Sequence, residues 1–434
     1  MTGAPGLGPR RAALQILEQV RAGRPFEAAL DRGIGDLAEP DRRLAHELAA
    51  GVLRQRSSLD QRLAPFVSRG WDNVAPELQD ILRLGAYQLT ELGRVPAHAA
   101  VDTSVSLARR TNGSKAAGFV NAVLRQLSRS RDQGKVVPGT DPSSLAAAYS
   151  HPVWLVQRWV TQFGIADAER LLQWNNTRPR LTAQPARREL GDLEARWQAE
   201  GIEVDPAPFE AGLMPDRSRP GDLPGYQQGD FLIQSPAQAL LTRYAEIEPG
   251  LSIYDACAAP GGKAVALGRV AGRVIAGDIN PARSRRLGEN LSRAGSGREH
   301  VIVADARHPP VRQVDVVLLD APCSGTGTFA RRPDARWRVT SEALGNLERL
   351  QAELLDCAAG VVRPGGLLVY ATCSLEPEEN AQQVGRFLAR QPDFRREPSH
   401  SVPAELLTSE GDLMVLPQKH GIDGAYAARL RRGT

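Results

Sequence analysis

The chain has 434 residues, of which 42% are hydrophobic and 24% are charged, a composition that is ordinary for a folded soluble protein and excludes extensive intrinsic disorder. At about 150 residues per domain, this length predicts roughly three domains. No apolar run approaches the roughly 18 residues of a membrane helix, and the first eleven residues lack the apolar core of a secretory signal, so we expect a cytoplasmic protein without a membrane partner.

The net charge of +4 is unevenly distributed along the chain. Residues 1–140 carry 20 Lys and Arg against 14 Asp and Glu, whereas residues 141–434 carry 34 against 36. A basic excess in the N-terminal third favours an anionic partner, most simply nucleic acid. A solvated basic surface without a partner is the alternative interpretation.

The chain contains four cysteines, at positions 257, 323, 357 and 373. The nearest two are 16 positions apart, so there is no C-x-x-C pair for zinc or redox chemistry, and we expect no metal. A disulfide framework is not expected in a reducing cytosol. The thiols are therefore either buried fillers or chemical groups.

Residues 8–132 have the apolar periodicity of an all-α bundle. Helices are predicted over residues 10–21, 42–54, 76–92, 97–110 and 116–127. The following stretch, residues 132–144, contains Gly, Pro, Thr and Ser and is predicted to be a linker.

Residues 145–228 are predicted to form a small α+β module, with a helical part over 151–174 and one further helix over 190–200. From residue 229 to 434 short apolar strands alternate with helices, which is typical of a doubly wound, mostly parallel, Rossmann-like sheet. The predicted strands cover residues 252–257, 274–278, 301–305, 314–320 and 367–372, and the clearest helices cover 281–293 and 340–359. The predicted fold class is thus multidomain, with an α/β domain at the C-terminus.

A glycine-containing loop follows the first strand of this α/β domain. The run Asp255-Ala-Cys-Ala-Ala-Pro-Gly-Gly-Lys263 opens a helix, and its two glycines permit a tight turn and a close approach of backbone to a ligand. It is not a Walker A loop, because Cys257 stands where Gly is needed and Ala264 follows the lysine. It also lacks the G-x-G-x-x-G pattern, which disfavours a dinucleotide.

Acidic residues stand at the ends of three successive predicted strands. Asp278 ends the second strand, 23 residues after Asp255, and an acid there can accept both hydroxyls of a ribose. Asp305 ends the third strand, where it can reach an adenine edge. Each acid alone is equally well a helix N-cap, but three in register beside a Gly-Gly turn favour a ligand. Ribose and adenine without a phosphate-binding loop indicate S-adenosylmethionine.

Two cysteines follow the fourth and fifth predicted strands. The run Asp320-Ala-Pro-Cys-Ser-Gly-Thr-Gly327 ends one strand, and Tyr370-Ala-Thr-Cys-Ser-Leu-Glu-Pro-Glu-Glu-Asn380 ends the other. The carboxyl ends of strands are where α/β sheets bind ligands, so Cys323 and Cys373 are expected to face one crevice beside an acid. The alternative is two buried cysteines that act as small hydrophobic residues. We expect both thiols to be partly exposed, in a setting that favours the thiolate.

One Cys, one Asp and a second group for release suit methylation at C5 of cytosine. That carbon is too electron-poor to attack a methyl sulfonium until a thiolate adds to C6. An acid at N3 stabilises the charge that develops on the ring. The C5 proton must then leave and the thiolate must be expelled.

These runs resemble the signature motifs of the RNA cytosine-5 methyltransferases, the Nol1/Nop2/Sun family. The resemblance implies that Cys373 is the nucleophile, that Cys323 assists product release and that Asp320 orients the cytosine. The DNA cytosine-5 enzymes instead use a cysteine of the fourth-strand motif. The positions that match the family's cofactor contacts are Cys257, Ala258, Ala259, Pro260, Gly261, Gly262, Lys263, Asp278, Asp305 and Asp320.

The N-terminal third resembles a NusB-type RNA-binding helical domain through residues 81–89, 95–101 and 115–125. A NusB-type domain joined to this catalytic domain is similar to bacterial enzymes that methylate one cytosine of 16S ribosomal RNA. The resemblance implies 16S ribosomal RNA as the partner, no DNA, and a monomer. The basic residues Arg178, Arg180, Arg187 and Arg188 of the α+β module are expected to guide the RNA strand.

Two other functions remain open at this point. A tRNA cytosine-5 methyltransferase would use the same motifs, and a NusB-like binding factor would have the same fold without activity. The intact Cys373, Cys323, Asp320 and Lys263 count against the binding factor. Two positions depart from the family pattern: Ser235 stands where an acid is frequent, and Ala425 replaces an aromatic residue.

Overall fold

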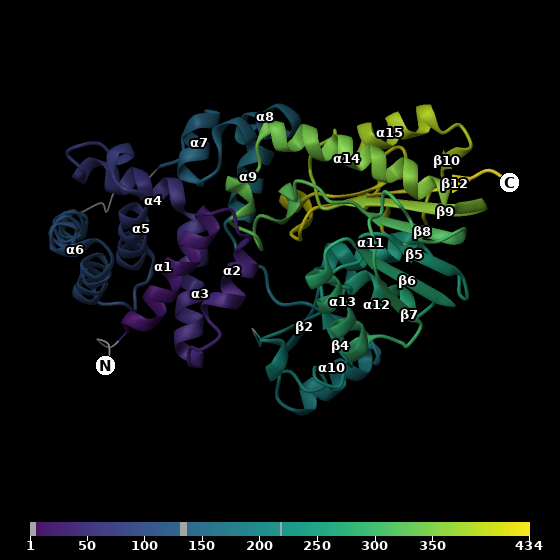
Figure 1. The fold of residues 1–434 in the computed structure, drawn as a ribbon, viewed down its shortest axis with the longest axis horizontal. Coiled ribbons are helices and arrows are strands. Elements are labelled where there is room, and N and C mark those ends of the chain that lie inside the picture. The colour runs from purple at the N-terminus through teal and green to yellow at the C-terminus, as the bar shows by residue number, and fades with distance from the viewer. Residues whose placement is uncertain (1–5, 131–136, 218) are drawn as a thin grey trace. The chain divides into compact units, whose positions relative to one another are not determined.

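The computed structural model describes residues 6–130, 137–217 and 219–434 (Figure 1). Its contacts divide the chain into two compact units. The first unit contains the chain up to Thr177 together with a distant segment, Phe329–Arg338. The second unit contains Arg178–Thr328 and Val339–Thr434. In the part of the chain that is described, no helix is long and apolar enough to cross a membrane.

The first unit is helical, as its apolar periodicity predicts. Its helices are α1 (Leu7–Arg21), α2 (Phe26–Gly33), α3 (Glu39–Arg54), α4 (Arg56–Leu63), α5 (Pro76–Glu91), α6 (Ala97–Arg129), α7 (Pro142–Ala148), α8 (Val153–Phe163) and α9 (Ile165–Asn175). Helices α1, α3, α5 and α6 bury one apolar cluster between them. Gly85 allows α5 to approach α6, because a Cβ there would lie 2.4 Å from a methyl group of Leu124.

Two predicted boundaries in this unit can be compared with the structure. The two helices predicted over 97–110 and 116–127 are the halves of α6, which is interrupted at Gly113 with φ at 85°. The predicted linker over 132–144 is wrong at its end, because α7 already begins at Pro142. Asp141 caps α7 by accepting hydrogen bonds from the N–H groups of Ser143 and Ser144. Residues 132–136 of that linker lie outside the described residues.

The segment Phe329–Arg338, which follows the Cys323 motif, packs within the helical unit. Arg336 is fully buried and donates hydrogen bonds to the backbone oxygen of Asn175 at 2.7 Å and to Oδ1 of Asn176 at 2.8 Å. The indole N–H of Trp337 donates to the backbone oxygen of Leu53 at 2.8 Å. Since buried polar groups need partners, these bonds make the segment part of the helical unit.

The second unit begins with a four-stranded antiparallel sheet, in the order β2-β3-β1-β4. Its strands are β1 (Ala183–Pro185), β2 (Val204–Pro206), β3 (Leu213–Pro215) and β4 (Phe231–Ile233). The predicted helix is present as α10 (Leu190–Ala199), and its Trp197 packs edge-on against Phe231. The predicted α+β character is confirmed, but the sheet includes β4, beyond residue 228, and the predicted helical part over 151–174 lies in the first unit as α8 and α9.

The larger sheet of the second unit has eight strands, with the path β10-β12-β9-β8-β5-β6-β7 and β11 paired to β12. Its strands are β5 (Ser252–Asp255), β6 (Arg273–Asp278), β7 (Glu299–Val303), β8 (Val314–Asp320), β9 (Val362–Thr372), β10 (Phe394–Arg396), β11 (Leu413–Val415) and β12 (Ala425–Arg432). The five predicted strands are the parallel ones, and the last three pair antiparallel. After β5 the chain adds β6 and β7 on one side of it, and then adds β8 and β9 on the other side. The topological switch point therefore lies between β5 and β8.

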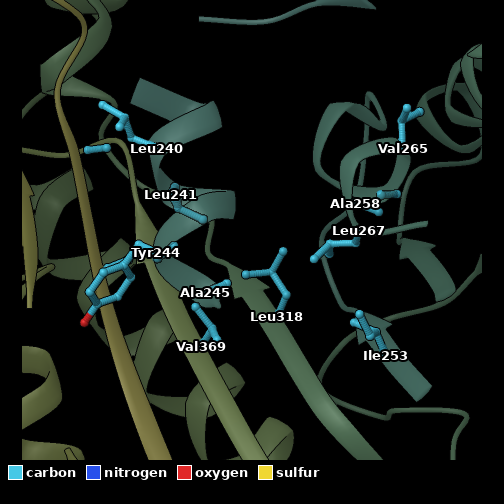
Figure 2. Close-up of a cluster of buried hydrophobic side chains, with 14 of the residues drawn as sticks. Leu240, Leu241, Tyr244, Ala245, Ile253, Ala258, Val265, Leu267, Leu318 and Val369 are labelled. Atoms are coloured by element: carbon cyan, nitrogen blue, oxygen red, sulfur yellow. The ribbon is translucent and has the colours of Figure 1, made fainter. Parts of the chain in front are cut away.

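Helices cover both faces of this sheet (Figure 1). One apolar cluster joins the sheet to α11 (Pro236–Ala245), α12 (Gly262–Gly268) and α13 (Pro281–Ala294), and part of it is drawn in Figure 2. The opposite cluster joins it to α14 (Ser341–Gly360) and α15 (Ala381–Arg390). Neighbours along β8 alternate between them, since Leu318 faces the first cluster and Val317 the second. The mostly parallel α/β architecture is thus confirmed.

Candidate active site

The loop after β5 lies at the switch point of the large sheet. It turns at Gly261, whose φ of 109° is in the left-handed region, and leads directly into α12. A Cβ at Gly261 would also lie 2.8 Å from a methyl group of Leu287, so the turn needs glycine for space as well. The backbone N–H of Ala258 is used inside the protein, because it donates to the backbone oxygen of Gly277 at 2.8 Å.

Lys263 is bound to an acid of the neighbouring strand. Its Nζ lies 2.5 Å from Oδ2 of Asp320, at the end of β8, and 2.6 Å from Oε1 of Gln238. Burial acts to lower the pKa of Lys263, but the charge and hydrogen bond of Asp320 raise it overall. A buried lysine that is held by a carboxylate and an amide is not free to hold a phosphate.

Asp255 is a buried carboxylate at the end of β5. It has no exposed surface, and neither of its oxygens accepts a hydrogen bond from the described residues. Burial, opposed by the Lys263 charge, raises its pKa to about 7. Burial and the neighbouring acids also raise the pKa of Cys257 to about 12, so this cysteine is a neutral thiol at pH 7.

The two remaining acids of the cofactor prediction are each paired with an arginine. Asp278 ends β6 and lies 3.0 Å from Arg283, whose side chain is 61% exposed. Asp305 lies 2.7 Å from Arg307, whose side chain is 46% exposed, and this hydrogen-bonded pair lowers the pKa of Asp305. The prediction that Asp305 ends its strand is wrong, because β7 ends at Val303 and Asp305 lies in the loop beyond it.

The two cysteines of the predicted site lie together. Cys323 follows β8 and Cys373 follows β9, and their sulfurs are 3.3 Å apart. The backbone N–H of Cys373 also points to the Cys323 sulfur, at 3.4 Å. Both residues are partly exposed, as expected.

The prediction of a thiolate-favouring setting is wrong for Cys323. Its hydrogen bond with Cys373, its burial and the nearby negative charges hold its pKa well above the ordinary value. The nearby lysine that could favour a thiolate, Lys263, is bound to Asp320 instead.

Sequence reasoning misses the residues that fasten the two cysteine loops together. Glu379 is fully buried and accepts a hydrogen bond from the backbone N–H of Ser324 at 2.9 Å and another from Nε2 of Gln351 at 2.9 Å. Glu379 belongs to the Tyr370–Asn380 run, but the motif alone assigns it no role. An acid close after the second cysteine is the available signal, although nothing in the sequence shows that it reaches Ser324.

The arginines expected to guide RNA have partners within the protein. Arg180 lies 2.5 Å from Asp205, and Arg188 lies 3.2 Å from Asp230. Arg187 donates to the backbone oxygen of Ser292 at 3.1 Å. These bonds stabilise the small sheet and its surroundings.

The residues at the switch point fit S-adenosylmethionine. The unsatisfied oxygens of Asp255 suit a ligand that carries hydrogen-bond donors, and Asp278 lies where a ribose is expected. Lys263, the lysine of the loop, is already paired and does not offer its charge to a phosphate. These acceptor groups therefore match a nucleoside cofactor without phosphate.

Comparisons with known proteins agree with this architecture. The family described as "16S rRNA methyltransferase RsmB/F" matches residues 244–431, the NusB family matches residues 8–129, and the "Methyltr_RsmF/B-like, ferredoxin-like domain" matches residues 151–220. The solved structure "Crystal Structure of PH0851" has a TM-score of 0.83, with 24% identity over 99% of this chain and 100% of that one, and shows the same fold.

Two relatives cover nearly the whole chain. A protein of Synechocystis named "Probable ribosomal RNA small subunit methyltransferase B" is 33% identical over 98% of this chain and 100% of its own length. The "Ribosomal RNA small subunit methyltransferase B" of Klebsiella pneumoniae is 34% identical over 88% of this chain and 90% of its own. With a NusB-type helical region, a ferredoxin-like region and a Rossmann-like methyltransferase domain in one chain, this protein belongs to the ribosomal RNA small subunit methyltransferase B family of RNA methyltransferases.

Proposed function

We propose that the protein methylates C5 of a specific cytosine in 16S ribosomal RNA, through a covalent bond between Cys373 and C6 of the base. The observation that carries this proposal is the pair of sulfurs 3.3 Å apart, Cys323 and Cys373, with Asp320 at the end of the strand that leads to Cys323. A nucleophile, an acid and a second thiol are the groups that C5 methylation requires.

In the proposed first step, the Cys373 thiolate adds to C6, and the electron pair of the C5–C6 double bond moves onto the ring. N3 takes up a proton from water as this electron pair arrives and returns it when the thiolate leaves. The Asp320 carboxylate faces N3 and accepts a hydrogen bond from the N3–H, and Lys263 keeps Asp320 in place through their 2.5 Å contact. C5 is now nucleophilic and takes a methyl group. S-adenosylmethionine supplies that methyl group when it is bound.

In the proposed second step, C5 loses its proton to water, and the double bond reforms as the bond between carbon and sulfur breaks. The electron pair of that bond returns to Cys373. Cys323 assists this release from its position beside the leaving sulfur. The product is 5-methylcytosine, and both cysteines are regenerated.

We propose that the cofactor is held by Asp278 at the ribose, by Asp305 at the adenine, and by the loop Cys257–Lys263. The acid pairs support this assignment, since the exposed Arg283 and Arg307 can turn away when hydroxyl and amino groups approach the carboxylates. Asp255 adds a buried acceptor at the same edge of the sheet.

We propose that the substrate is held by a NusB-like domain over residues 8–132 and guided by the module over 145–228 to the catalytic domain over 229–434. The basic excess of residues 1–140 supports RNA backbone contacts there. The target base is unpaired or flipped, because attack on C6 needs access perpendicular to the ring. We expect a cytoplasmic monomer.

The test is transfer of a labelled methyl group from S-adenosylmethionine to small-subunit ribosomal RNA, followed by bisulfite sequencing of the product. We expect one protected cytosine with the wild type and none with Cys373→Ala. Methylation of tRNA but not of 16S ribosomal RNA would move the activity to the alternative substrate. RNA binding without methyl transfer would indicate a binding factor.

A further inference from the structure

A buried carboxylate joins the two cysteine loops and has no role in the steps above. Glu379 lies between β9 and α15, and its side chain has no exposed surface. One of its oxygens accepts hydrogen bonds from the backbone N–H of Ser324 and from Nε2 of Gln351, each at 2.9 Å. The other oxygen accepts a hydrogen bond from the hydroxyl group of Ser324, with the two oxygens 2.5 Å apart. Ser324 directly follows Cys323. Glu379, which belongs to the loop that contains Cys373, is therefore hydrogen-bonded to the loop that contains Cys323.

Further bonds continue this connection on both sides of the cysteine pair. The hydroxyls of Ser324 and Ser374 are 3.0 Å apart, and Ser374 directly follows Cys373. The backbone N–H of Gly327 donates to the backbone oxygen of Cys373 at 3.0 Å. The two loops are therefore joined by one hydrogen-bond network, which fixes the distance and orientation of the two sulfurs.

The three groups that bind the Glu379 carboxylate are all neutral. A buried charge without a cation beside it is costly, and an uncharged amide of the same size would accept the same backbone hydrogen bond at lower cost. We therefore expect the negative charge of Glu379 to act on the neighbouring cysteine thiols, in addition to the packing role of its side chain.

We propose that Glu379 is a positioning residue for Cys323: its carboxylate holds the Cys323 loop against the Cys373 loop, and its negative charge keeps the Cys323 thiol protonated. The use of that proton rests on the proposed function. A protonated Cys323 cannot compete as nucleophile, but it can donate its S–H to the neighbouring sulfur.

The charges around Cys323 agree with this role. Its pKa is raised first by the hydrogen bond with Cys373, then by burial, and then by the charges of Cys373, Glu379 and Asp320. The hydroxyl of Tyr370 donates to the backbone oxygen of Glu379 at 2.6 Å, and burial holds its pKa well above the ordinary value, so it is neutral. Two cations lie nearby. The contact of Lys263 with Asp320 offsets that acid's charge, and Arg386 donates to the backbone oxygen of Glu378 at 2.9 Å and pairs with Glu348 at 2.9 Å. Glu379 is held by neutral donors, which leaves it as the fixed negative charge on this side of Cys323.

A protonated Cys323 has a defined use during release. When the bond between C6 and the Cys373 sulfur breaks, its electron pair returns to that sulfur as a thiolate. The S–H of Cys323, with its sulfur 3.3 Å away, donates a hydrogen bond to this thiolate and stabilises the leaving group. No bond at Cys323 is made or broken, and the C5 proton leaves to water.

The experiment measures the rate at which iodoacetamide alkylates Cys323 in the full chain between about pH 7 and pH 10, with each cysteine followed separately by peptide mass spectrometry. Four proteins are compared: wild type, Glu379→Gln, Gln351→Met and the control Glu353→Gln. Glu353 is an exposed acid on the same helix as Gln351, so its variant removes a charge away from the cysteine loops. Circular dichroism checks the fold of each.

We expect Glu379→Gln to speed Cys323 alkylation at pH 8 by about tenfold, the effect of lowering a thiol pKa by one unit. Gln351→Met removes a donor but leaves the Glu379 charge less compensated, so it should slow the reaction about twofold or more. Glu353→Gln should match the wild type. A merely structural role would loosen the loop in both network variants and speed both.

Faster alkylation in both network variants, or no change in Glu379→Gln, would overturn the proposal. If Glu379→Gln does not fold, Gln351→Met decides, since an unchanged or faster rate contradicts the charge role. The methyl-transfer assay separates this inference from the proposed function. If the wild type does not methylate RNA, the proposed function is refuted and the alkylation result still stands. If the wild type is active but Glu379→Gln does not change the alkylation rate of Cys323, only the role of Glu379 is refuted.

Discussion

The cofactor side and the cysteine side of the candidate site are built in opposite ways. On the cofactor side, Asp278 and Asp305 pair with arginines whose side chains are 61% and 46% exposed. Ion pairs that reach water are weak and exchange their partners easily. On the cysteine side, the loops are joined by buried bonds among Glu379, Ser324 and Ser374.

The difference reflects what each side does in the proposed reaction. A cofactor must enter and leave, so its acids need partners that can be displaced. Two thiols that act in sequence on one ring must keep their separation, and a buried, satisfied polar network resists rearrangement. The comparison predicts that substitutions on the cofactor side change affinity, whereas those on the cysteine side change the fate of the reaction.

The largest effect is expected at the cysteines. Cys373→Ala should abolish methylation and any denaturant-resistant complex between protein and RNA, because the proposed mechanism needs this thiol to attack C6. Cys323→Ala should allow addition and methyl transfer but slow release, so that the covalent complex accumulates. A denaturing gel of each variant with RNA and cofactor measures both outcomes.

The gel also shows whether the two roles are exchanged. A complex trapped by Cys373→Ala but not by Cys323→Ala would assign the nucleophile to Cys323, as in the DNA enzymes. If neither variant traps a complex, the account of release is wrong. Cys357→Ala is the matched control, because this thiol lies on α14 and should leave the gel pattern unchanged.

Asp255 should produce the next largest effect, on stability. Its pKa is raised from 3.8 to about 7 in the folded protein, so the fold favours the protonated acid. The unfolding free energy that it contributes is full below about pH 4 and is lost as the pH rises through about 7, by up to about 4 kcal/mol. Urea unfolding of wild type and Asp255→Asn across this range isolates the contribution.

The asparagine variant should gain stability relative to wild type as the pH rises, because it remains neutral throughout. A constant difference between the two proteins from about pH 4 to pH 7.5 would show that Asp255 is charged in the fold. The buried acid would then need a partner that the described residues do not provide.

Asp278→Ala should weaken S-adenosylmethionine binding about tenfold or more without unfolding the protein. Hydrogen bonds to a charged group contribute about 1.5–3 kcal/mol each, and the ribose would lose two. Arg283→Gln removes only the displaceable partner and should leave binding equal or slightly tighter. Calorimetry with both variants sharpens the comparison, and unchanged affinity in Asp278→Ala would remove this acid from the site.

The smallest effect is expected in the helical unit. Its exposed basic residues belong neither to the cofactor side nor to the cysteine side of the candidate site. Arg109, Arg110 and Lys115 are exposed on α6. Replacing all three by Ala should weaken RNA binding and make its salt dependence shallower, by about 0.7 in slope for each phosphate that the variant no longer neutralises. Fluorescence anisotropy over a salt series measures the slope.

The control is the double variant Arg312→Ala, Arg395→Ala, which removes two exposed arginines of the other unit, and its change of slope is compared with that of the triple variant per charge removed. An equal change of slope in the control would mean that the basic excess of the N-terminal third is only a solvated surface. Point substitutions are preferable to deletion of residues 1–140, because Arg336 and Trp337 donate hydrogen bonds to the backbone oxygens of Arg54 and Leu53, which the deletion would remove.

Much of this molecule could be predicted from local patterns. The Gly-Gly turn, the acids at strand ends and the two Cys-Ser motifs are short runs whose chemistry depends on neighbouring residues. The parallel strands of the large sheet are predictable because each is a short apolar run bounded by turn residues. The errors are local too: β7 ends two residues before Asp305, and α7 begins inside the expected linker.

The sequence by itself therefore predicted the kinds of domain, which the structure confirms, and it is the source of the proposed cofactor class and of the residues proposed to carry the chemistry. Only the tertiary structure decided how these residues are partnered, because the deciding bonds join positions far apart in the chain. Glu379 reaches Ser324 across 55 positions, and Lys263 reaches Asp320 across the switch point. Strand order brings such pairs together, and strand order depends on packing the whole sheet, which no short run encodes. The same packing raises the pKa of Cys323, since the hydrogen bond with Cys373, the burial and the nearby charges all depend on neighbouring strands and loops.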